Sequence, residues 1–304
     1  MPNEERITLS TAIGSGTWRK NLALAQTDAR QFTLNFVDVS PIHRAFAPMA
    51  REQKFDVSEM AIVTALQALA YGKPLMLLPV TLAARFQHGC LITRKSETAL
   101  TPAALAGRRV GVRAYTQTTG VWLRGILEND YGVPASAIRW VTQEDAHVAE
   151  YRDPAWVERA VPGRSLVDLL RSGDIDAAIL GNDLPDDPDF IPLISGPRET
   201  AKIWYDKHNV LPINHMLVVR KDIASAHPEA IRELWHVIHR AKPQGSQGPD
   251  MAAIGIAANF PALAMILKYC KQQKLLPRTM SVHEIFAETI ELLRDEAKST
   301  KLEA

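Results

Sequence analysis

The segment from Arg109 to Gly125 constrains the fold more than any other part of the chain. It runs from a short apolar stretch through a hydroxyl-rich turn into a helical pattern. The β-branched residues Val110 and Val112 predict a buried strand. Thr118 or Thr119 can cap the helix that follows, because threonine oxygens accept hydrogen bonds from the amides of a first turn. Such a strand–turn–helix unit is suited to bind an anion at the helix start.

Predicted strands and helices alternate along most of the sequence. Strands are predicted at 6–10, 33–39, 55–60, 75–79, 90–93, 109–113, 138–141, within 173–181 and at 210–220. After Lys221 the pattern is helical, with helices predicted at 228–241, 250–259, 261–274 and 281–297. This alternation predicts an α/β protein with a mostly parallel sheet that is covered on both faces.

The length of 304 residues suits two domains rather than one. We expect a discontinuous first α/β lobe formed by residues 1–109 and 212–304, which includes the C-terminal helices. Residues 110–211 are expected to form a second α/β lobe. A ligand would then bind between the lobes and be enclosed by hinge closure.

The balance of charges bears on the expected binding partners, and the cysteines bear on the expected compartment. Lys and Arg total 35 against 34 Asp and Glu, so no bulk field attracts nucleic acid or anionic lipid. No apolar stretch approaches the ~20 residues that span a bilayer, and the first residues lack the pattern of a secretory signal. Cys90 and Cys270 stand in apolar surroundings, which favours buried thiols in a reducing compartment. We expect a cytoplasmic protein without nucleic-acid or membrane partners, and association into a homo-oligomer stays open.

Several stretches together resemble one known family. They are Phe55–Met60, Arg85–His88, Arg109–Gly125, Gly173–Ala177 and Leu211–Arg220. In their order and in their amino-acid sequences, these stretches resemble the 4,5-dihydroxyphthalate decarboxylase family, which has the type II periplasmic-binding-protein fold. The resemblance implies a two-lobed α/β fold with a central ligand cleft. It also implies a carboxy-lyase that converts a hydroxylated aromatic acid, 4,5-dihydroxyphthalate, to protocatechuate and CO2.

The implied reaction requires a proton donor, a clamp for a carboxylate and polar groups for the phenols. The phenol itself supplies the electrons when the ring is protonated, so we expect no cofactor and no metal. Consistent with this, the sequence contains no phosphate loop or dinucleotide fingerprint. The expected ligand is a small aromatic carboxylate.

His215 and His88 are the candidate catalytic proton donors, because histidine titrates near neutral pH. His215 stands in an apolar strand pattern, where histidine is unexpected, and His88 follows Arg85 and Phe86 in a turn. Each lies in a stretch that matches the family. The alternatives are a hydrogen-bonded core histidine for His215 and a solvated loop histidine for His88.

Most candidate substrate-binding residues fall into two sets, and Trp122 could line the pocket or belong to the core. Arg85, Arg113 and Arg124 can each bind a carboxylate, and the alternatives are a surface arginine for Arg85 and a domain-surface pair for Arg124. Hydroxyl and carboxylate side chains also end predicted strands. Among these, Glu59 can orient a histidine, or be a helix-start carboxylate favoured by the helix dipole. The predicted substrate-binding residues are Ser10, Ser58, Glu59, Arg85, Arg113, Thr118, Thr119, Trp122 and Arg124.

A second class of function stays open. A solute-binding protein that captures an aromatic or carboxylated ligand, and does no chemistry on it, would use the same fold and the same anion site. Substitution of His215 separates the two, because only an enzyme would lose turnover while keeping affinity.

Overall fold

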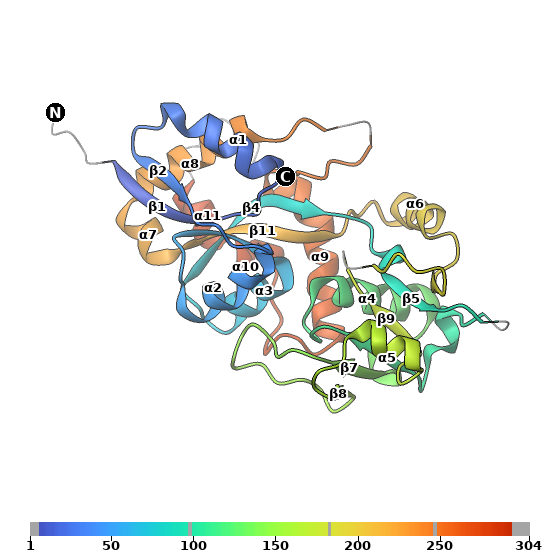
Figure 1. The fold of residues 1–304 in the computed structure, drawn as a ribbon. Coiled ribbons are helices and arrows are strands. Elements are labelled where there is room, and N and C mark those ends of the chain that lie inside the picture. The colour runs from blue at the N-terminus through green and yellow to red at the C-terminus, as the bar shows by residue number, and fades with distance from the viewer. Residues whose placement is uncertain (1–5, 97–98, 182–183, 246–247, 294–304) are drawn as a thin grey trace, which may run out of the picture. The chain divides into compact units, whose positions relative to one another are not determined.

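The computed structural model describes residues 6–96, 99–181, 184–245 and 248–293. The chain divides into two compact units. Unit 1 comprises residues 1–84, 213–264 and 280–304, and unit 2 comprises residues 85–212 and 265–279. Each unit is built on its own β-sheet (Figure 1). The first five residues, which bear on the expected lack of an export signal, lie outside the described part.

Unit 1 contains a five-stranded sheet in the order β2-β1-β3-β11-β4. The strands are β1 (Ile7–Ala12), β2 (Phe32–Phe36), β3 (Val57–Ala61), β4 (Leu75–Ala84) and β11 (Ile213–Arg220). The helices are α1 (Thr17–Ala25), α2 (Phe46–Glu52), α3 (Ile62–Ala70), α7 (Lys221–Ala226), α8 (Pro228–Ala241), the first part of α9 (Ile256–Gln272), α10 (Val282–Ile285) and α11 (Ala287–Leu292). β1 pairs in parallel with β2 and β3, whereas β11 runs antiparallel to β3 and β4.

The core of unit 1 joins α1 and α8 to the sheet. Leu234 and Trp235 of α8 and Trp18 and Leu22 of α1 are all buried in one apolar cluster with strand residues such as Leu217. Each helix buries one apolar stripe, and burial of such side chains contributes about 1.5–3 kcal/mol apiece relative to exposure. This packing holds the strands that carry the candidate residues of unit 1.

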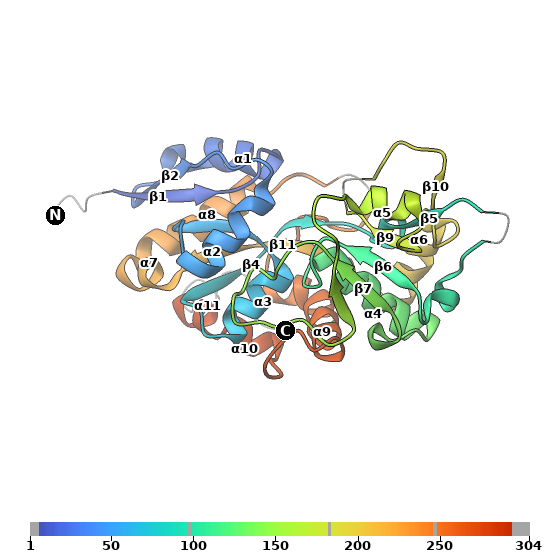
Figure 2. The ribbon, with the colours of Figure 1, turned by 60° about the horizontal axis from the view of Figure 1, so that its bottom comes forward.

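Unit 2 contains a six-stranded sheet in the order β10-β5-β9-β6-β7-β8. The strands are β5 (Leu91–Arg94), β6 (Arg109–Val112), β7 (Arg139–Thr142), β8 (Val157–Arg159), β9 (Ala177–Ile179) and β10 (Phe190–Pro192). The helices are α4 (Thr118–Tyr131), α5 (Leu166–Ser172), α6 (Pro197–His208) and the last part of α9. β6 pairs in parallel with β7 and β9 (Figure 2).

Local signals explain the ends of the helices in unit 2. Gly132 ends α4 with φ 70°, a left-handed conformation that glycine adopts without strain. Ser165 and Asp168 form a capping box at the start of α5, each side chain accepting from the other's backbone amide. The expected cap at Thr118 or Thr119 is wrong, however: Gln117 is the N-cap of α4 and makes no side-chain cap hydrogen bond.

The α/β fold class is confirmed, and within the described residues each sheet is mostly parallel, with one strand that runs against the others. In unit 1, β11 re-enters the sheet antiparallel to its neighbours. In unit 2, β5 runs antiparallel to both of its neighbours, β9 and β10. The apolar patterns of these strands predict burial, and they carry no information on strand direction.

The observed units differ from the expected lobes in two segments. The sequence placed residues 85–109 in the first lobe, but β5 pairs with β9 and β10 and therefore lies in unit 2. Residues 265–279 also lie in unit 2, where Gln273 bonds to Arg124. Both differences come from long-range pairing that no local pattern specifies.

Some elements differ from the predicted secondary structure. β8, β10, α6 and α7 were not predicted, and the predicted helices 250–259 and 261–274 are replaced by the single helix α9, which contains Pro261. The helix predicted at 281–297 is divided into α10 and α11, and residues 294–297 lie outside the described part. Among the described helices, none combines the length and the apolar character that a membrane span requires.

Candidate functional site

At one edge of the unit 1 sheet, side chains from β3 and β11 lie beside the loop that follows β1. β1 and β3 are parallel neighbours, so their carboxyl ends meet at the same edge. β11 runs antiparallel to β3, with His215 opposite Ala61, so the start of β11 lies at that edge too. In open α/β sheets, ligands bind beyond the carboxyl ends of the strands. The topology therefore places His215 at a position suited to a ligand.

His215 and Glu59 form a close pair at this edge. Leu217 lies opposite Glu59 in the strand register, so His215 is the diagonal neighbour of Glu59 on the same face of the sheet. Nδ1 of His215 lies 2.6 Å from Oε1 of Glu59, and the side chains are 23% and 9% exposed. The alternative of a helix-start carboxylate is wrong for Glu59, because the residue lies within β3.

Two further groups surround this pair. The backbone N–H of Gly14, in the loop after β1, donates to Oε2 of Glu59 at 2.9 Å. The ring of Phe46, the first residue of α2, meets the His215 imidazole edge-on with a centroid distance of 5.1 Å. Each carboxylate oxygen of Glu59 therefore has its own partner, and one side of the imidazole is held by an apolar ring.

This geometry decides which nitrogen of His215 can serve a ligand. A carboxylate can only accept, so it favours a proton on Nδ1 and orients the ring. Nε2 is then the nitrogen through which the ring would exchange a proton with another molecule. A partly exposed imidazole that is held by a carboxylate is the usual arrangement of a general acid or base.

The two predicted serines of unit 1 have structural partners. Ser10 donates through its hydroxyl to Asp56 at 2.8 Å, and Asp56 also pairs with Arg220. Ser58 is fully buried and donates to the carbonyl of Glu59 at 2.8 Å. Because side chains alternate along a strand, Ser58 lies on the opposite face of the sheet from Glu59. Neither hydroxyl joins the His215 pair.

A second cluster lies in unit 2, at the start of α4. Nη2 of Arg85 donates to Oγ1 of Thr119 at 3.0 Å. A Cβ on Gly181, in the turn after β9, would lie 3.4 Å from Nη2 of Arg85 and 3.5 Å from Nε2 of Gln117. The bare glycine thus leaves room beside both side chains. Because β6 and β9 are parallel, the turns that carry Gln117 and Gly181 follow strand ends on the same edge.

Two buried polar atoms in this cluster lack partners. Nε of Arg85 and Oε1 of Gln117 make no hydrogen bond within the described part of the chain. An unsatisfied buried polar group costs about 1–3 kcal/mol, so such atoms call for a ligand or another explanation. A donor on Arg85 and an acceptor on Gln117, beside the amides of a helix start, fit an anion that carries a neighbouring O–H group.

Two other predicted residues lie near the same helix start in sequence. Thr118 is buried at the first position of α4. Arg113 follows β6, and its Nε lies 3.6 Å from a carboxylate oxygen of Glu144. Its carbonyl accepts from the backbone amides of Gln143 and Glu144, which ties the turn after β6 to that after β7. Arg113 therefore already has an acidic neighbour.

His88 lies in the interior of unit 2 rather than in a solvated loop. It is 1% exposed, and its ring packs against Trp204 at a centroid distance of 5.8 Å. Neither ring nitrogen has a hydrogen-bond partner in the described chain. Desolvation lowers the pKa of His88 to about 4, although the nearby Asp130 carboxylate opposes this shift. The imidazole is therefore neutral at neutral pH.

Trp122 and Arg124 are part of the unit 2 core. Trp122 is fully buried and meets the ring of Tyr269 edge-on at 5.7 Å. Arg124 is also fully buried: its Nε donates to Gln273 at 2.7 Å, and its guanidinium lies 4.0 Å from the ring centroid of Tyr115. Burial lowers the pKa of the Arg124 guanidinium. These contacts join α4 to the end of α9.

Sequence patterns missed three residues that the structure brings to these sites. Gly14, Gln117 and Gly181 were not selected as site residues, because a loop glycine and a glutamine occur in many turns. Gly14 lay within the Gly14–Gly16 loop after the first predicted strand, and Gln117 lay inside the central motif. The sequence shows that these residues lie in loops, but the side chains that they contact are far away in the chain.

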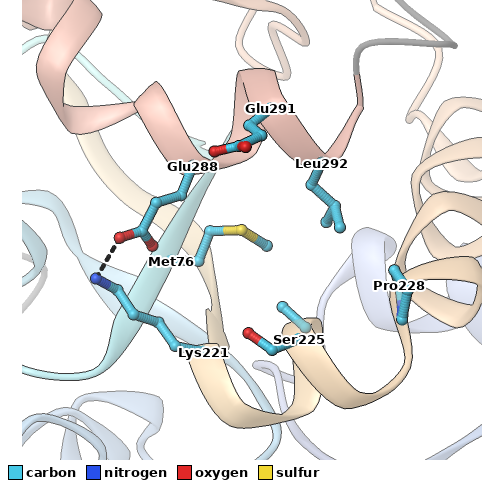
Figure 3. A pocket seen from close by; sticks show the side chains of 8 residues that line it. Met76, Lys221, Ser225, Pro228, Glu288, Glu291 and Leu292 are labelled. Atoms are coloured by element: carbon cyan, nitrogen blue, oxygen red, sulfur yellow. Dashed lines mark hydrogen bonds and ion pairs between the residues drawn. The ribbon is translucent and has the colours of Figure 1, made fainter.

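A separate pocket in unit 1 contains none of the predicted site residues. It has a volume of about 350 Å³ and is lined by Met76, Lys221, Ala224, Ser225, Pro228, Glu288, Glu291 and Leu292. Figure 3 shows the Lys221 ammonium paired with Glu288, a contact of 2.5 Å, beside the carboxylate of Glu291. In the described residues, no three His, Cys, Asp or Glu side chains are grouped to hold a metal ion.

Comparison with curated proteins finds two relatives with the same name. A 4,5-dihydroxyphthalate decarboxylase of Comamonas testosteroni is 32% identical over 197 residues, 59% of this chain and 58% of that protein. A 4,5-dihydroxyphthalate decarboxylase of Pseudomonas putida is 28% identical over 168 residues, 51% and 65% of the two chains. The chain thus spans about three fifths of the length of the curated relatives it matches. The resemblance found in the sequence is confirmed, and no family model matches.

Solved structures share the fold at low identity. The periplasmic sulfonate-binding protein SsuA of Methylobacillus flagellatus matches with a TM-score of 0.53 and 12% identity, over 100% of this chain and 97% of that one. The desulfurization enzyme DSZB matches with a TM-score of 0.53 and 14% identity, over 97% and 99% of the two chains. The fold is therefore that of periplasmic binding proteins, and it carries both a binding protein and an enzyme.

Proposed function

We propose that this protein removes a carboxylate, as CO2, from a hydroxylated aromatic acid, with 4,5-dihydroxyphthalate as the first substrate to test. The observation that carries the proposal is the pairing of His215 with Glu59 at the ligand edge of the unit 1 sheet. A binding protein needs no oriented imidazole, whereas a decarboxylase needs a proton donor. The shared name of the two curated relatives supports the same reaction.

The chemistry balances with a single proton donor. A hydroxyl para to the departing carboxylate pushes electron density into the ring, and the carboxylate-bearing carbon takes a proton from the acid. A C–H bond forms, and the ring becomes a cyclohexadienone-like cation stabilised by the para oxygen. The C–C bond then breaks, CO2 leaves, and the bonding pair restores aromaticity. Water reprotonates the acid, so the reaction consumes no oxidant or reductant.

His215 suits the acid role better than His88. Glu59 orients the His215 imidazole through Nδ1, so the ring would give its proton from Nε2. His88 is buried, and with its pKa lowered to about 4 it carries no second proton at neutral pH. We therefore assign the proton transfer to His215 and a structural role to His88.

The cluster at the start of α4 is proposed as an anion site of unit 2 that is suited to a carboxylate. Arg85 supplies a charge and a buried Nε donor, and the first amides of α4 add partial positive charge. Gln117 supplies an acceptor for a hydroxyl. These polar groups would bind a hydroxylated acid more tightly than an apolar ring, because an apolar ring offers them no hydrogen-bond partner.

A solute-binding protein is the second candidate function, and the likeness to a sulfonate-binding protein favours it. The likeness to a desulfurization enzyme favours catalysis on the same fold, so the fold alone does not separate the two candidates. Both candidates use an anion site. Only the decarboxylase requires the His215 pair.

Incubation with 4,5-dihydroxyphthalate, followed by chromatography for protocatechuate and by CO2 release, tests the proposal. His215→Asn, which removes the acid, is the matched control, and calorimetry measures ligand binding by both proteins. Turnover by the parent alone, with binding by both, supports the decarboxylase. Binding without turnover across a panel of hydroxylated aromatic acids would reject the enzyme in favour of a binding protein.

We also propose that the protein acts in the cytoplasm. Cys90 and Cys270 are both free and buried, which supports a compartment where thiols stay reduced. Fractionation of cells that express the full-length gene product tests this. Recovery with periplasmic markers would contradict it.

A further inference from the structure

We propose that the backbone N–H of Gly14 is a positioning group for His215, acting through Glu59. The inference rests on the proposed function, since it names a further residue on which proton transfer depends. The amide donates to Oε2 of Glu59 at 2.9 Å, while Oε1 lies 2.6 Å from Nδ1 of His215. The two oxygens of one carboxylate therefore connect the loop after β1 to the imidazole.

The second partner matters because a carboxylate turns easily. The terminal torsion of glutamate is broad, so a single hydrogen bond leaves the plane of the carboxylate loosely defined. Binding at both oxygens fixes that plane and directs Oε1 at the imidazole. Glu59 is buried, which strengthens both hydrogen bonds.

The absence of a Cβ at position 14 leaves the Glu59 carboxylate in its place. A Cβ there would lie 3.3 Å from Oε2 of Glu59 and 3.6 Å from Cβ of Ile42. The first distance is too short for an ordinary contact, so an alanine would displace the carboxylate by a few tenths of an ångström. The carboxylate is at the end of a flexible side chain. The Glu59 side chain would therefore move, and the backbone would stay in place.

A displaced carboxylate would loosen its hold on the imidazole. With Oε1 moved, the neutral ring could carry its proton on Nε2 instead of Nδ1. In the proposed reaction the ring leaves proton transfer with Nδ1–H and a bare Nε2, so a carboxylate that fails to favour this state slows the step.

Gly16 offers a matched control in the same loop. A Cβ on Gly16 would meet nothing within 4 Å, and its φ of −76° suits any residue. We would therefore compare Gly14→Ala with Gly16→Ala, using 15N NMR of histidine-labelled protein and assigning the His215 signal by its loss in His215→Asn. The NMR measurement needs no substrate.

The parent and Gly16→Ala are expected to show the Nδ1–H form of neutral His215. Gly14→Ala should show a population shift toward Nε2–H and a kcat roughly 10–100-fold lower, with KM within about twofold of the parent. If Gly14→Ala fails to fold, Glu59→Asp replaces it: the shorter carboxylate cannot span both partners, and the same shift is expected.

An unchanged His215 spectrum in the folded variant would overturn the inference. A shifted spectrum without turnover by the parent would instead reject the decarboxylase and leave the positioning role of Gly14 standing. A shifted spectrum with unchanged kcat would show that the amide positions the ring without supporting proton transfer, and would reject the inference as stated.

Discussion

Nδ1 of His215 lies 2.6 Å from Oε1 of Glu59, although 156 residues separate them in the chain. The contact exists because β11 pairs with β3 in an antiparallel register that makes the two residues diagonal neighbours. An oriented imidazole at the ligand edge of a sheet is the part of this protein that most directly indicates chemistry.

Substitution of this pair should reduce the chemical step. His215→Asn removes the acid, and we expect kcat to fall by roughly 10²–10⁴-fold, with a much smaller change in KM. Glu59→Gln offers one acceptor oxygen where the carboxylate offers two, so the ring is held less well and a smaller decrease is expected. Steady-state kinetics of protocatechuate formation provide the measurement. Equal kcat values for His215→Asn and the parent would assign proton transfer to another group.

Substitution of Arg85 should act on binding rather than on chemistry. Arg85→Lys keeps a charge but loses the Nε donor and the fork geometry, so KM should rise roughly 10–100-fold while kcat changes little. Arg139→Ala, an exposed arginine on β7 of the same unit, is the control and should leave KM unchanged. A KM for Arg85→Lys equal to that of the control would show that the carboxylate binds elsewhere.

The buried His88 should make stability depend on pH. Its pKa is lowered from 6.5 to about 4, so between these values the unfolded chain binds the proton that the folded protein excludes. Stability should therefore fall as pH drops from 6.5 to 4, by about 3 kcal/mol in total from this residue. Urea denaturation across this range, compared with His88→Leu, measures the contribution.

In His88→Leu the fall should be smaller by that amount, because leucine binds no proton. His283→Gln, at an exposed position, should retain the full dependence. Identical pH dependence in His88→Leu and the parent would mean that His88 titrates normally, which would restore it as a candidate acid.

Arg124 should matter for stability and not for substrate affinity. Arg124→Ala leaves a cavity and unpairs Gln273, so we expect a loss of about 3 kcal/mol or more in the free energy of unfolding. KM of the folded fraction should stay within about twofold of the parent, because the side chain is fully buried between Tyr115 and Gln273. A large rise in KM with unchanged stability would return Arg124 to the binding site.

Local amino-acid patterns are enough to predict the α/β class and the main helices and strands of this protein. Strand β6, the start of α4 and the glycine that ends it follow from β-branched alternation, a polar turn and the freedom of Gly132 at positive φ. These signals are local, because each depends on a few neighbouring residues. The segment that contains β6 and the start of α4 is also one of those that resemble the decarboxylase family.

Which candidate residues come into contact depends on the tertiary structure. The pairing of β5 with β9 moved residues 85–109 into unit 2, and the register of β11 brought His215 to Glu59. Burial distinguishes the two candidate histidines, because His88 is buried in the interior whereas His215 is partly exposed. Strand register, strand direction and desolvation depend on residues far apart in the chain, so no local pattern of this sequence could specify them.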